Sequence, residues 1–429
     1  MSHCTVFCTY PLAKILKGLS LPTCIQRCVI SSKQEEIPKA HTVCEAKSLF
    51  SVTEEQDRRT LLASREAFFL DEKGRLSFLC KLDSSEDPLQ TLYFHTTEDA
   101  LAFIAEYPEP QKQIPLLIEE YASLLKKGKL VAFPTETVYG LGADATNEEA
   151  VKRIFSAKQR PFFDPLIVHI ADLSQLEGLA MDVSEQAYTL MRTFWPGPLT
   201  LVLKKSANVP SLVTAGSETV AVRMPANALA LSLIKASGLA IAAPSANRFG
   251  YTSPTTARHV KEQLGDRIEA VLDGGACTVG IESTVLSLCT EVPTILRPGK
   301  IGIEELTPIL GTVAMAQKAG PTDTTLPSPG LLDSHYAPTT PFYLVDDVSL
   351  YQDRSDVGVI LVEKSSVPFK GPVVTISETD DAEEVARRLY WAIRHLDSMH
   401  LTCMVGSLME ERGIGVAINN RLRKAATKA

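Results

Sequence analysis

The stretch that decides the fold is Leu130–Ile170, which reads LVAFPTETVYGLGADATNEEAVKRIFSAKQRPFFDPLIVHI. Its first residues, Leu130–Phe133, form a short apolar run that is typical of a buried strand. A loop rich in glycine and hydroxyl side chains follows. Thr146 then begins a Thr-x-x-Glu sequence, which predicts a capping box at the start of a helix. Pro165–Ile170 is apolar again, so the stretch is predicted to form strand, loop, helix and strand.

Two cations stand at the end of the predicted helix: Lys158 and Arg160, just before Pro161. Open α/β sheets bind ligands at the carboxyl ends of their strands, where the hydroxyl groups and free N–H groups of this loop are expected. Cations beside such a loop suit an anionic ligand, most simply a nucleotide phosphate. The alternative is structural, because basic side chains in a last helical turn also bind its free carbonyl groups.

Short motifs elsewhere follow the order found in one family. PTETVYGLGADA, AKQRP and DPLIVHI precede WPGPLT (Trp195–Thr200), VAVRMP (Val220–Pro225), APSAN (Ala243–Asn247), EST (Glu282–Thr284) and LRPG (Leu296–Gly299). Together they resemble the YrdC-type threonylcarbamoyl-AMP synthases. His335-Tyr336-Ala337-Pro338 and the terminal GIGVAINNRLRKAA resemble the linker and the ending of the long form of these enzymes.

The resemblance implies a nucleotidyltransferase that joins L-threonine, bicarbonate and ATP into threonylcarbamoyl-AMP and releases pyrophosphate. In the family, a separate transferase then moves the threonylcarbamoyl group to an adenosine beside the tRNA anticodon. That transferase and tRNA are therefore expected partners. ATP is expected as a substrate with Mg²⁺, and no tightly bound cofactor is predicted. The sequence identifies no catalytic residue and no cluster of metal ligands.

The resemblance also assigns residues to the threonine pocket. Arg223 is the natural partner of the amino acid's carboxylate, because a guanidinium group matches two oxygens. The alternatives are that Arg223 is a surface arginine of a strand and that His169 is an ordinary core histidine; general base is a further role for His169. The residues implied for threonine are Thr137, His169, Arg223, Ala243 and Ser283.

A second group is implied for ATP. Lys158 and Arg160 would hold phosphates, and Tyr336 would close over the nucleotide as a lid that excludes water. Lone serines and asparagines are more often turn residues, which is the alternative for several members. The residues implied for ATP are Lys158, Arg160, Asp164, Thr219, Ser245, Asn247, Ser253, Arg297 and Tyr336.

Several residues depart from the family pattern, and they lie in or near the segments implied for ATP binding. Asp164 stands where asparagine is usual, which places a carboxylate near the triphosphate. Phe249 replaces a usual serine, and Leu332 and Ser334 occupy linker positions where basic residues are common. The two linker changes argue against phosphate contacts from the linker, and Asp164 raises the alternative of a regulatory relative that binds nucleotide without catalysis. Activity is expected to be retained, because the main basic and pocket residues are present.

The predicted fold class is α/β: a YrdC-like twisted mixed sheet with helices, a small C-terminal Rossmann-like α/β domain, and an unassigned N-terminal extension. Proline-, glycine-, serine- and threonine-rich sequence predicts a linker between the two folded parts. The expected divisions are an extension at 1–110, a synthase domain at 111–307, a linker or lid at 308–341 and the C-terminal domain at 342–429.

The N-terminal extension carries weaker signals. Residues 1–34 contain no Asp or Glu, which resembles an organellar targeting peptide, although a cytoplasmic protein is the simpler interpretation. Cys4-x₃-Cys8 and Cys24-x₃-Cys28 have poor spacing for zinc, and the nine cysteines suit reduced thiols. Strands are predicted at Ala67–Leu70, Leu76–Leu82 and Leu92–His95, and a helix at Thr97–Glu106.

Composition limits the other function classes. No apolar run approaches the roughly 18 residues that a transmembrane helix needs, so no membrane partner is expected. The net charge is −8, and residues 115–305 hold 18 Lys and Arg against 20 Asp and Glu, which argues against RNA binding as the main function. The carbamoyltransferase of hydrogenase maturation contains a related domain, but its preceding acylphosphatase and zinc-finger segments have no counterpart in this sequence.

Overall fold

The structure is a computed structural model that describes residues 110–316 and 336–427, apart from 363, 364, 366 and 380; before residue 110 it describes five strands only. The chain divides into two compact units. One comprises Met1–Ile118 with Gly274–Ala276, and the other comprises Glu119–Asp273 with Cys277–Ala429. Within the described ranges, every helix is too short or too polar to cross a bilayer.

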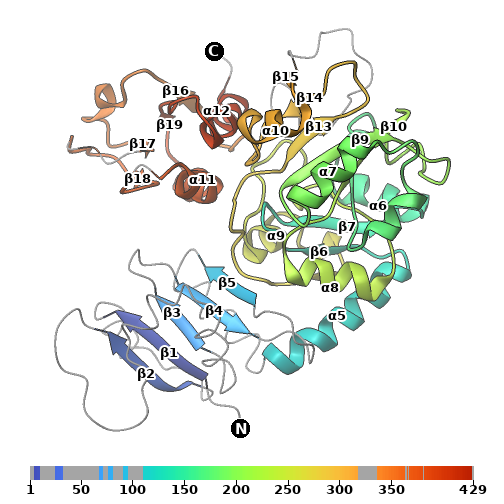
Figure 1. The fold of residues 1–429 in the computed structure, drawn as a ribbon. Helices are drawn as coiled ribbons and strands as arrows, with labels where there is room; N and C mark the ends of the chain where they lie inside the picture. The colour runs from blue at the N-terminus through green and yellow to red at the C-terminus, as the bar shows by residue number, and fades with distance from the viewer. Residues whose placement is uncertain are drawn as a thin grey trace. The chain divides into compact units, whose positions relative to one another are not determined.

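The first unit contains a five-stranded sheet in the order β2-β1-β3-β4-β5, drawn in blue in Figure 1. The predicted strands near residues 67, 76 and 92 are confirmed as β3, β4 and β5, whereas β1 and β2 were not predicted. The helix predicted at Thr97–Glu106 and the side chains of the paired cysteines lie outside the described residues. The strands are β1 (Cys4–Thr9), β2 (Ile25–Ser31), β3 (Ala67–Leu70), β4 (Leu76–Cys80) and β5 (Gln90–Phe94).

The second unit is built on a ten-stranded sheet in the order β12-β6-β7-β11-β8-β10-β9-β13-β14-β15. Parallel pairs such as β8–β10 and β9–β13 occur beside antiparallel pairs such as β6–β7 and β9–β10, which confirms the predicted mixed sheet. The strands are β6 (Val131–Phe133), β7 (Gly140–Asp144), β8 (Ile167–His169), β9 (Leu199–Lys204), β10 (Thr219–Arg223), β11 (Ile241–Ala242), β12 (Ala270–Val271), β13 (Thr284–Ser287), β14 (Thr294–Arg297) and β15 (Ala314–Met315).

Buried apolar side chains from several helices form one large core with this sheet. In α6 the buried residues Val151, Ile154 and Phe155 recur at helical spacing, as the sequence predicts. Figure 1 shows α6 and α7 among the helices around the sheet. The helices up to residue 310 are α5 (Pro110–Lys126), α6 (Glu148–Lys158), α7 (Glu185–Phe194), α8 (Ala228–Ser237), α9 (Ala257–Leu264) and α10 (Ile303–Leu310), with 3₁₀ turns at Leu173–Gly178 and Gly265–Arg267.

The capping box predicted at Thr146 is wrong by one residue. Asn147 is the N-cap of α6, and its Oδ1 accepts a hydrogen bond of 3.1 Å from the Ala150 N–H. The Thr146 hydroxyl instead donates to Asp144 Oδ1 at 2.8 Å. Asparagine is at least as good an N-cap as threonine, and the two stand side by side, so the pattern alone could not choose between them.

The register of three central strands brings separate motifs together. β8 and β10 run parallel with Arg223 opposite His169, and β11 runs antiparallel to β8 with Ile241 opposite His169. Ala243 follows β11 and donates its N–H to the Ile167 carbonyl at 2.9 Å. His169 and Arg223 therefore end two neighbouring strands, and Ala243 lies beside Ile167 at the start of β8. Because β8 has only three residues, residues from three distant motifs are brought close together along it.

The larger sheet extends beyond the predicted start of the linker. Pro308, expected to begin the linker, lies inside α10, and β15 then pairs with β14 at the sheet edge. The segment 308–316 is therefore not a structureless linker. Residues 317–335, which include Leu332 and Ser334, lie outside the description.

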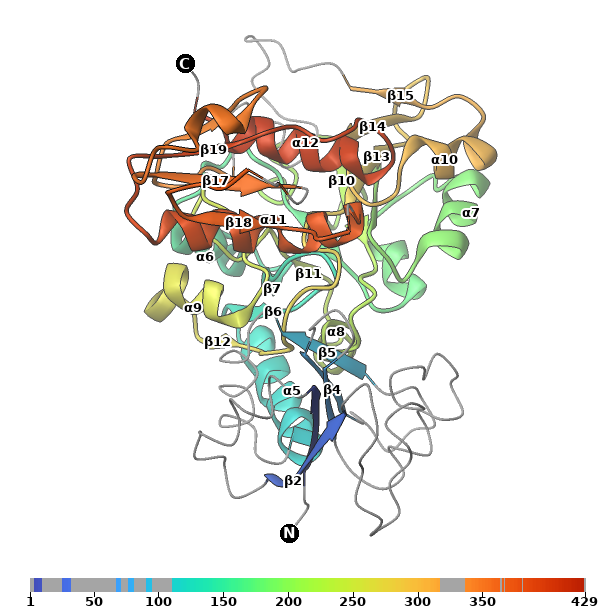
Figure 2. The same ribbon diagram turned by 90° about the vertical axis from the view of Figure 1, so that its left-hand side faces the viewer.

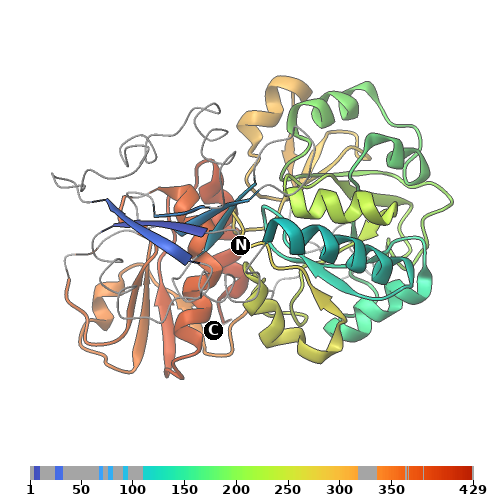
Figure 3. The ribbon, with the colours of Figure 1, turned by 90° about the horizontal axis from the view of Figure 1, so that it is seen from below.

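The C-terminal module, residues 336–427, contains a four-stranded parallel sheet in the order β16-β19-β17-β18. It confirms the predicted small Rossmann-like α/β domain. Its apolar side chains pack with those of α11 and α12 in one core cluster, and Figures 2 and 3 show both helices beside the sheet. The elements are β16 (Phe342–Leu344), a 3₁₀ turn at Val348–Tyr351, β17 (Val357–Leu361), β18 (Val373–Thr375), α11 (Ala382–Asp397), β19 (Cys403–Gly406) and α12 (Ile414–Ala425).

Candidate functional site

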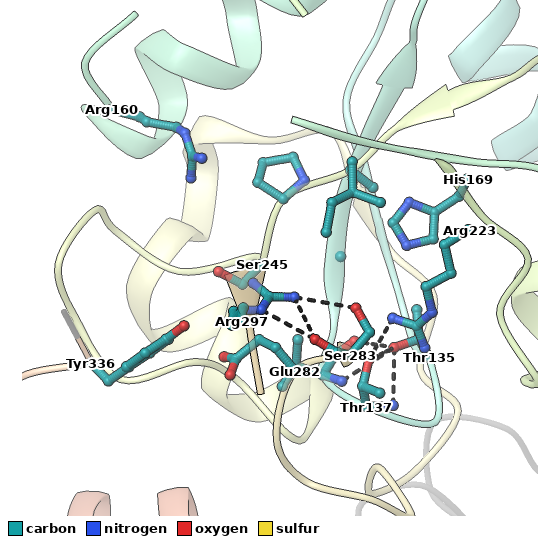
Figure 4. Close-up of a pocket in the computed structure, with 15 residues that line it drawn as sticks. Thr135, Thr137, Arg160, His169, Arg223, Ser245, Glu282, Ser283, Arg297 and Tyr336 are labelled. Carbon is teal, nitrogen blue, oxygen red and sulfur yellow. Dashed lines mark hydrogen bonds between the residues drawn. The ribbon is translucent and has the colours of Figure 1, made fainter. Parts of the chain in front are cut away.

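A cavity of about 530 Å³, its open mouth included, is lined by the first and last residues of β8, by the last residue of β10 and by the segment that follows β11. All five residues predicted for threonine line it, together with Arg160, Ser245, Arg297 and Tyr336 from the group predicted for ATP. Figure 4 shows His169 and Arg223 on one side and Tyr336 on the other. The lining residues are Thr135, Thr137, Val138, Gly140, Arg160, Ile167, His169, Arg223, Ala243, Pro244, Ser245, Glu282, Ser283, Arg297 and Tyr336.

Arg223 and His169 lie at one end of the cavity, which is called the first end below. Arg223 is buried there, and three neighbouring residues hold its guanidinium group. Its Nη1 donates to Thr137 Oγ1 at 2.8 Å, and its Nε donates to the Gly197 carbonyl at 3.2 Å. Its Nη2 lies 2.5 Å from Glu136 Oε1 in a buried ion pair. The guanidinium group is therefore fixed in orientation, and each of its Nη atoms carries a second N–H that these contacts leave unused.

Glu136 is a member of this end that the sequence reasoning missed. Its carboxylate pairs with Arg223 and accepts a hydrogen bond of 3.0 Å from the Ala226 N–H. Glu136 thus ties the loop after β6 to the loop after β10. The available signal was its position between Thr135 and Thr137 in the first motif, beside two residues that already pointed to a binding loop.

His169 is buried beside Arg223, and its Nδ1 accepts no hydrogen bond from the described residues. Burial, followed by the positive charge of Arg223, lowers the pKa of His169 to about 3. The imidazole is therefore neutral at physiological pH and can accept a hydrogen bond. With so low a pKa it is a weak base, which disfavours the general-base role considered from the sequence.

We expect His169 to stay neutral across physiological pH. A chemical-shift titration of its imidazole should show no protonation between about pH 5 and pH 8. Because the folded pKa lies below the usual 6.5, the unfolded chain binds this proton first. The His169 contribution therefore lowers the free energy of unfolding as the pH falls from 6.5 towards 3. A His169 midpoint near 6.5 would contradict this account.

Hydroxyl groups connect the two ends of the cavity. Thr135 Oγ1 lies 2.8 Å from Thr137 Oγ1, and Ser283 Oγ lies 2.8 Å from Thr200 Oγ1. Arg297 donates to both oxygens of Ser283, from Nη2 to the carbonyl at 3.0 Å and to Oγ at 3.2 Å. Ser283 therefore contacts Arg297 directly, and it lines the same cavity as Thr137 (Figure 4).

The cationic end is formed by Arg160 and Arg297. Arg160 donates from Nε to the Asp164 carbonyl at 3.1 Å and from Nη2 to the Pro165 carbonyl at 2.8 Å. Its Nη2 is also 2.8 Å from Asp164 Oδ2, in a fully buried ion pair. Burial raises the pKa of Asp164, and the charge of Arg160 opposes that rise. Asp164 does not line the cavity; it lies behind Arg160 and orients its guanidinium group.

Lys158 does not line the cavity either. Its buried Nζ donates to the Ser245 carbonyl, to the Asn247 carbonyl at 2.5 Å and to Asn247 Oδ1 at 3.5 Å. Burial, with the nearby charge of Arg160, lowers the pKa of Lys158 well below its usual value. Lys158 therefore holds the loop that presents Ser245 to the cavity, which is a different role from the direct phosphate contact implied by the sequence.

We expect Lys158→Met to impair both stability and ATP use. The substitution leaves the part-buried Ser245 carbonyl and the buried Asn247 carbonyl without their donor, at a cost of about 1–3 kcal/mol. Thermal unfolding and the KM for ATP measure the two effects, and Lys152→Met is the matched control, because Lys152 is an exposed lysine of the same helix. A normal KM for ATP in Lys158→Met would show that the loop does not need this lysine.

Three other residues predicted for ATP lie away from the cavity wall. Asn247 donates from Nδ2 to the carbonyls of Arg248 and Tyr251 at 2.8 and 2.7 Å, so it shapes the loop. Ser253 donates to Glu282 Oε1 at 2.6 Å and supports a wall residue. Thr219 begins β10 and lies four residues before Arg223, about 13 Å along the strand, so the structure does not bring it to the cavity.

Tyr336 lines the cavity beside Arg160 and Arg297. Its side chain is buried, and its backbone is in the left-handed region, with φ 66°. Its carbonyl accepts a hydrogen bond of 3.2 Å from the Thr252 hydroxyl, and the next residue, Ala337, donates to the Gly250 carbonyl at 2.9 Å. Burial and the negative charge of Glu282 raise the pKa of Tyr336 to about 12, so its hydroxyl remains a donor at physiological pH.

Comparisons with known proteins agree with these features. A family described as "Telomere recombination" matches residues 123–299, and one described as "Threonylcarbamoyl-AMP synthase, C-terminal domain" matches residues 301–427. The threonylcarbamoyl-AMP synthase of Pyrococcus abyssi is 44% identical over 322 residues, which are 71% of this chain and 92% of that protein. The enzyme of the same name from Bacillus subtilis is 45% identical over 321 residues, which are 72% of this chain and 92% of that protein.

A solved structure is similar as well. The crystal structure of P. abyssi Sua5 complexed with L-threonine has 44% sequence identity to this chain and a TM-score of 0.68, and the match covers 72% of this chain and 94% of that chain. The predicted family is confirmed by sequence and by fold. The chain therefore belongs to the threonylcarbamoyl-AMP synthase family, in the form that carries the additional C-terminal domain.

Proposed function

We propose that this chain forms threonylcarbamoyl-AMP and pyrophosphate from L-threonine, bicarbonate and ATP. The observation that supports this function is one cavity with two different ends. A fixed guanidinium group, a neutral imidazole and hydroxyl groups lie at one end, and two arginines under a buried tyrosine lie at the other. An amino acid and a nucleotide can therefore bind in the same cavity with their reacting groups close together.

The first end is assigned to threonine. Arg223 would bind the carboxylate through N–H groups that Thr137, Gly197 and Glu136 leave unused, and Ser283 would hydrogen-bond the substrate. His169, being neutral, would accept a hydrogen bond from the amine. The methyl group of Ala243 takes little space on the wall, which leaves room for a branched side chain.

The chemistry requires two steps at this junction. The unprotonated amine of threonine adds to the carbon of bicarbonate, and water leaves, which forms a carbamate. A carbamate oxygen then attacks the α-phosphorus of ATP, and the bond to pyrophosphate breaks. The protein's contribution is mainly position and charge neutralisation: Arg160 and Arg297 would bind phosphate oxygens whose negative charge grows as the bond breaks.

Mg²⁺ would enter with ATP. The described residues contain no group of three or more Asp, Glu, His or Cys side chains placed to hold a metal ion. Two carboxylates that interact with the arginines of the cationic end are already paired, Asp164 with Arg160 and Glu282 with Arg421. Magnesium is commonly held by substrate phosphates with few protein ligands, and its bound form supplies positive charge to the triphosphate. The described residues around the cavity fit a magnesium ion that is held mainly by the phosphates of ATP.

The division of the chain and its setting are proposed with this function. We place the N-terminal extension at 1–110, the synthase part at 111–316 and the linker after residue 316, because β15 belongs to the larger sheet. The C-terminal module follows. A tRNA threonylcarbamoyl transferase would receive the adenylate, with tRNA as a further partner. The cytoplasm is the proposed compartment, and an organelle is the alternative that the acid-free residues 1–34 suggest.

Pyrophosphate release tests the function. We expect purified protein to release pyrophosphate from ATP only when threonine and bicarbonate are both present, and serine or valine should substitute poorly for threonine. RNA binding that depends on salt, without release of pyrophosphate under any of these conditions, would favour the alternative of an RNA- or nucleotide-binding protein without synthase activity.

A further inference from the structure

Helix α11 of the C-terminal module directs a row of residues towards loops of the cavity. The hydroxyl of Tyr390 donates to Glu282, Arg394 donates to the Thr252 carbonyl, and Asp397 accepts from the N–H groups of Thr339 and Thr340. Spacings of four and three residues place Tyr390, Arg394 and Asp397 on one face of the helix. This face therefore contacts the wall residue Glu282, the 252 loop and the segment after Tyr336.

The helix backbone also comes unusually close to the loop that leads to Glu282. At Gly280, a Cβ atom would lie 2.3 Å from the Cα of Arg387 and 2.5 Å from its carbonyl oxygen. Gly280 has φ +84°, in the region that favours glycine. Any larger residue at position 280 would clash with the backbone of α11, so this close contact requires a glycine.

Glu282 is the centre of the contact and lies in the cavity wall. Its carboxylate accepts from Ser253 Oγ at 2.6 Å, from Tyr390 Oη at 3.0 Å and from Arg421 Nε at 2.7 Å. Burial opposes ionisation of Glu282, but Arg421 and then Arg297 outweigh it and lower its pKa to about 2. Glu282 is therefore a buried carboxylate anion, and two of its three donors belong to the C-terminal module.

Arg421, in α12, connects the segment that leads into β13 with the residue that follows β14. It is fully buried; its Nε binds Glu282, and its Nη1 donates to the Pro298 carbonyl at 2.9 Å. These two partners directly precede Ser283 and directly follow Arg297. Since Arg297 itself donates to Ser283, Arg421 contacts both flanks of that pair.

We propose that Arg421 and Tyr390 are positioning residues for the nucleotide end of the cavity, acting through Glu282, so that the C-terminal module completes the synthase site. This inference rests on the proposed function and deepens it. The module is not only an attached domain: it holds a wall carboxylate away from Arg297 and keeps the Ser283–Arg297 pair in place.

The charge of Glu282 makes the inference testable. Without Arg421, the buried carboxylate has Arg297 as its next cation, and a buried charge that has lost its partner is costly. Glu282 would then draw Arg297 away from Ser283 and from the nucleotide. Neutralising Glu282 removes that pull, so Glu282→Gln in the Arg421→Met background should restore function even though the ion pair is still absent.

A contact that only attaches the module would behave differently. Lys300 and Glu383 form an ion pair of 3.1 Å between the residues after β14 and α11, and both side chains are at least one-third exposed. Because exposed pairs add little to stability, Glu383→Gln is a matched control for loss of a charge contact between the same two parts. We expect this control to have normal ATP binding and activity.

The experiment measures ATP binding by calorimetry and threonine-dependent pyrophosphate release in the full chain. Arg421→Met should raise the Kd and the KM for ATP by about tenfold or more, equivalent to at least about 1.4 kcal/mol. The double variant Arg421→Met/Glu282→Gln should recover most of this loss, while the KM for threonine changes less than that for ATP in every variant. Equal ATP values for Arg421→Met and Glu383→Gln, or no recovery in the double variant, would overturn the proposal.

Two further variants protect the test from misfolding. If Arg421→Met does not fold, Arg421→Lys retains the charge but loses the contact to Pro298, and Tyr390→Phe removes one donor to Glu282. Both should raise the KM for ATP, and unchanged values in both would overturn the proposal. Wild-type protein without any pyrophosphate release would instead refute the proposed function, and the calorimetric Kd values would still decide the role of Arg421.

Discussion

Replacing Arg223 with lysine is expected to raise the KM for threonine by about tenfold to a hundredfold, which corresponds to the loss of one charge-assisted hydrogen bond of roughly 1.5–3 kcal/mol. Lysine keeps the charge but not the planar group that can bind two carboxylate oxygens. The KM for ATP should change little, because Arg160 and Arg297 are untouched. Steady-state kinetics with each substrate varied in turn gives both values.

Two controls separate this effect from general damage. Arg192→Lys changes an exposed arginine of α7 that pairs with Glu185 on the surface, and it should leave both KM values unchanged. Thermal unfolding of Arg223→Lys shows whether the altered contact with Glu136 destabilises the fold. A normal KM for threonine in a folded Arg223→Lys protein would mean that Arg223 is structural and that threonine binds elsewhere.

Replacing Arg160 is expected to have an effect of similar size on ATP. Arg160→Met alone would leave the buried Asp164 without its cation, so the double variant Arg160→Met/Asp164→Asn is the sharper test, because it removes both charges of the pair. We expect its KM for ATP to rise by about tenfold to a hundredfold, as for other lost charge-assisted contacts. The KM for threonine should stay near normal.

Asp164→Asn alone is the matched control for that variant. It keeps Arg160 and restores the residue that is usual in the family, so ATP use should be retained. If Arg160→Met/Asp164→Asn binds ATP as well as Asp164→Asn does, the phosphate-binding role of Arg160 is refuted.

Local patterns predicted most elements, and long-range pairing decided how they meet. The apolar runs that became β6 and β8 and the helix α6 between them were predicted from the sequence. The N-cap of α6 was predicted at Thr146 and is Asn147, a difference of one residue that is common at helix ends. The strand order, which puts Arg223 beside His169, depends on pairing between distant segments that no local pattern encodes.

The candidate site shows the same division. Residues in distinctive motifs, such as Thr137 and Ser245, do line the cavity. Thr219 does not, because a position at the start of a strand is far from one at its end. Glu136 and Glu282 were missed because their importance lies in buried partners, Arg223 and Arg421, which are far away in sequence.

Buried charge is the main physical feature of this site. Lys158, Arg160, Asp164, Arg223, Glu282 and Arg297 are all buried. Each loses hydration that its partners must replace, so such a cluster is a weak source of stability. Its value is that the charged groups are already oriented before a substrate binds, which is what transfer of a charged group requires.

Detection of the mixed anhydride tests the central claim most directly. Protein would be incubated with ATP, threonine and ¹³C-bicarbonate, and the products analysed at once by mass spectrometry. We predict a threonylcarbamoyl adenylate whose mass rises by one unit with the labelled bicarbonate and which disappears when threonine is omitted. Pyrophosphate with only threonyl-AMP, or AMP without any product that contains the labelled carbon, would contradict the account.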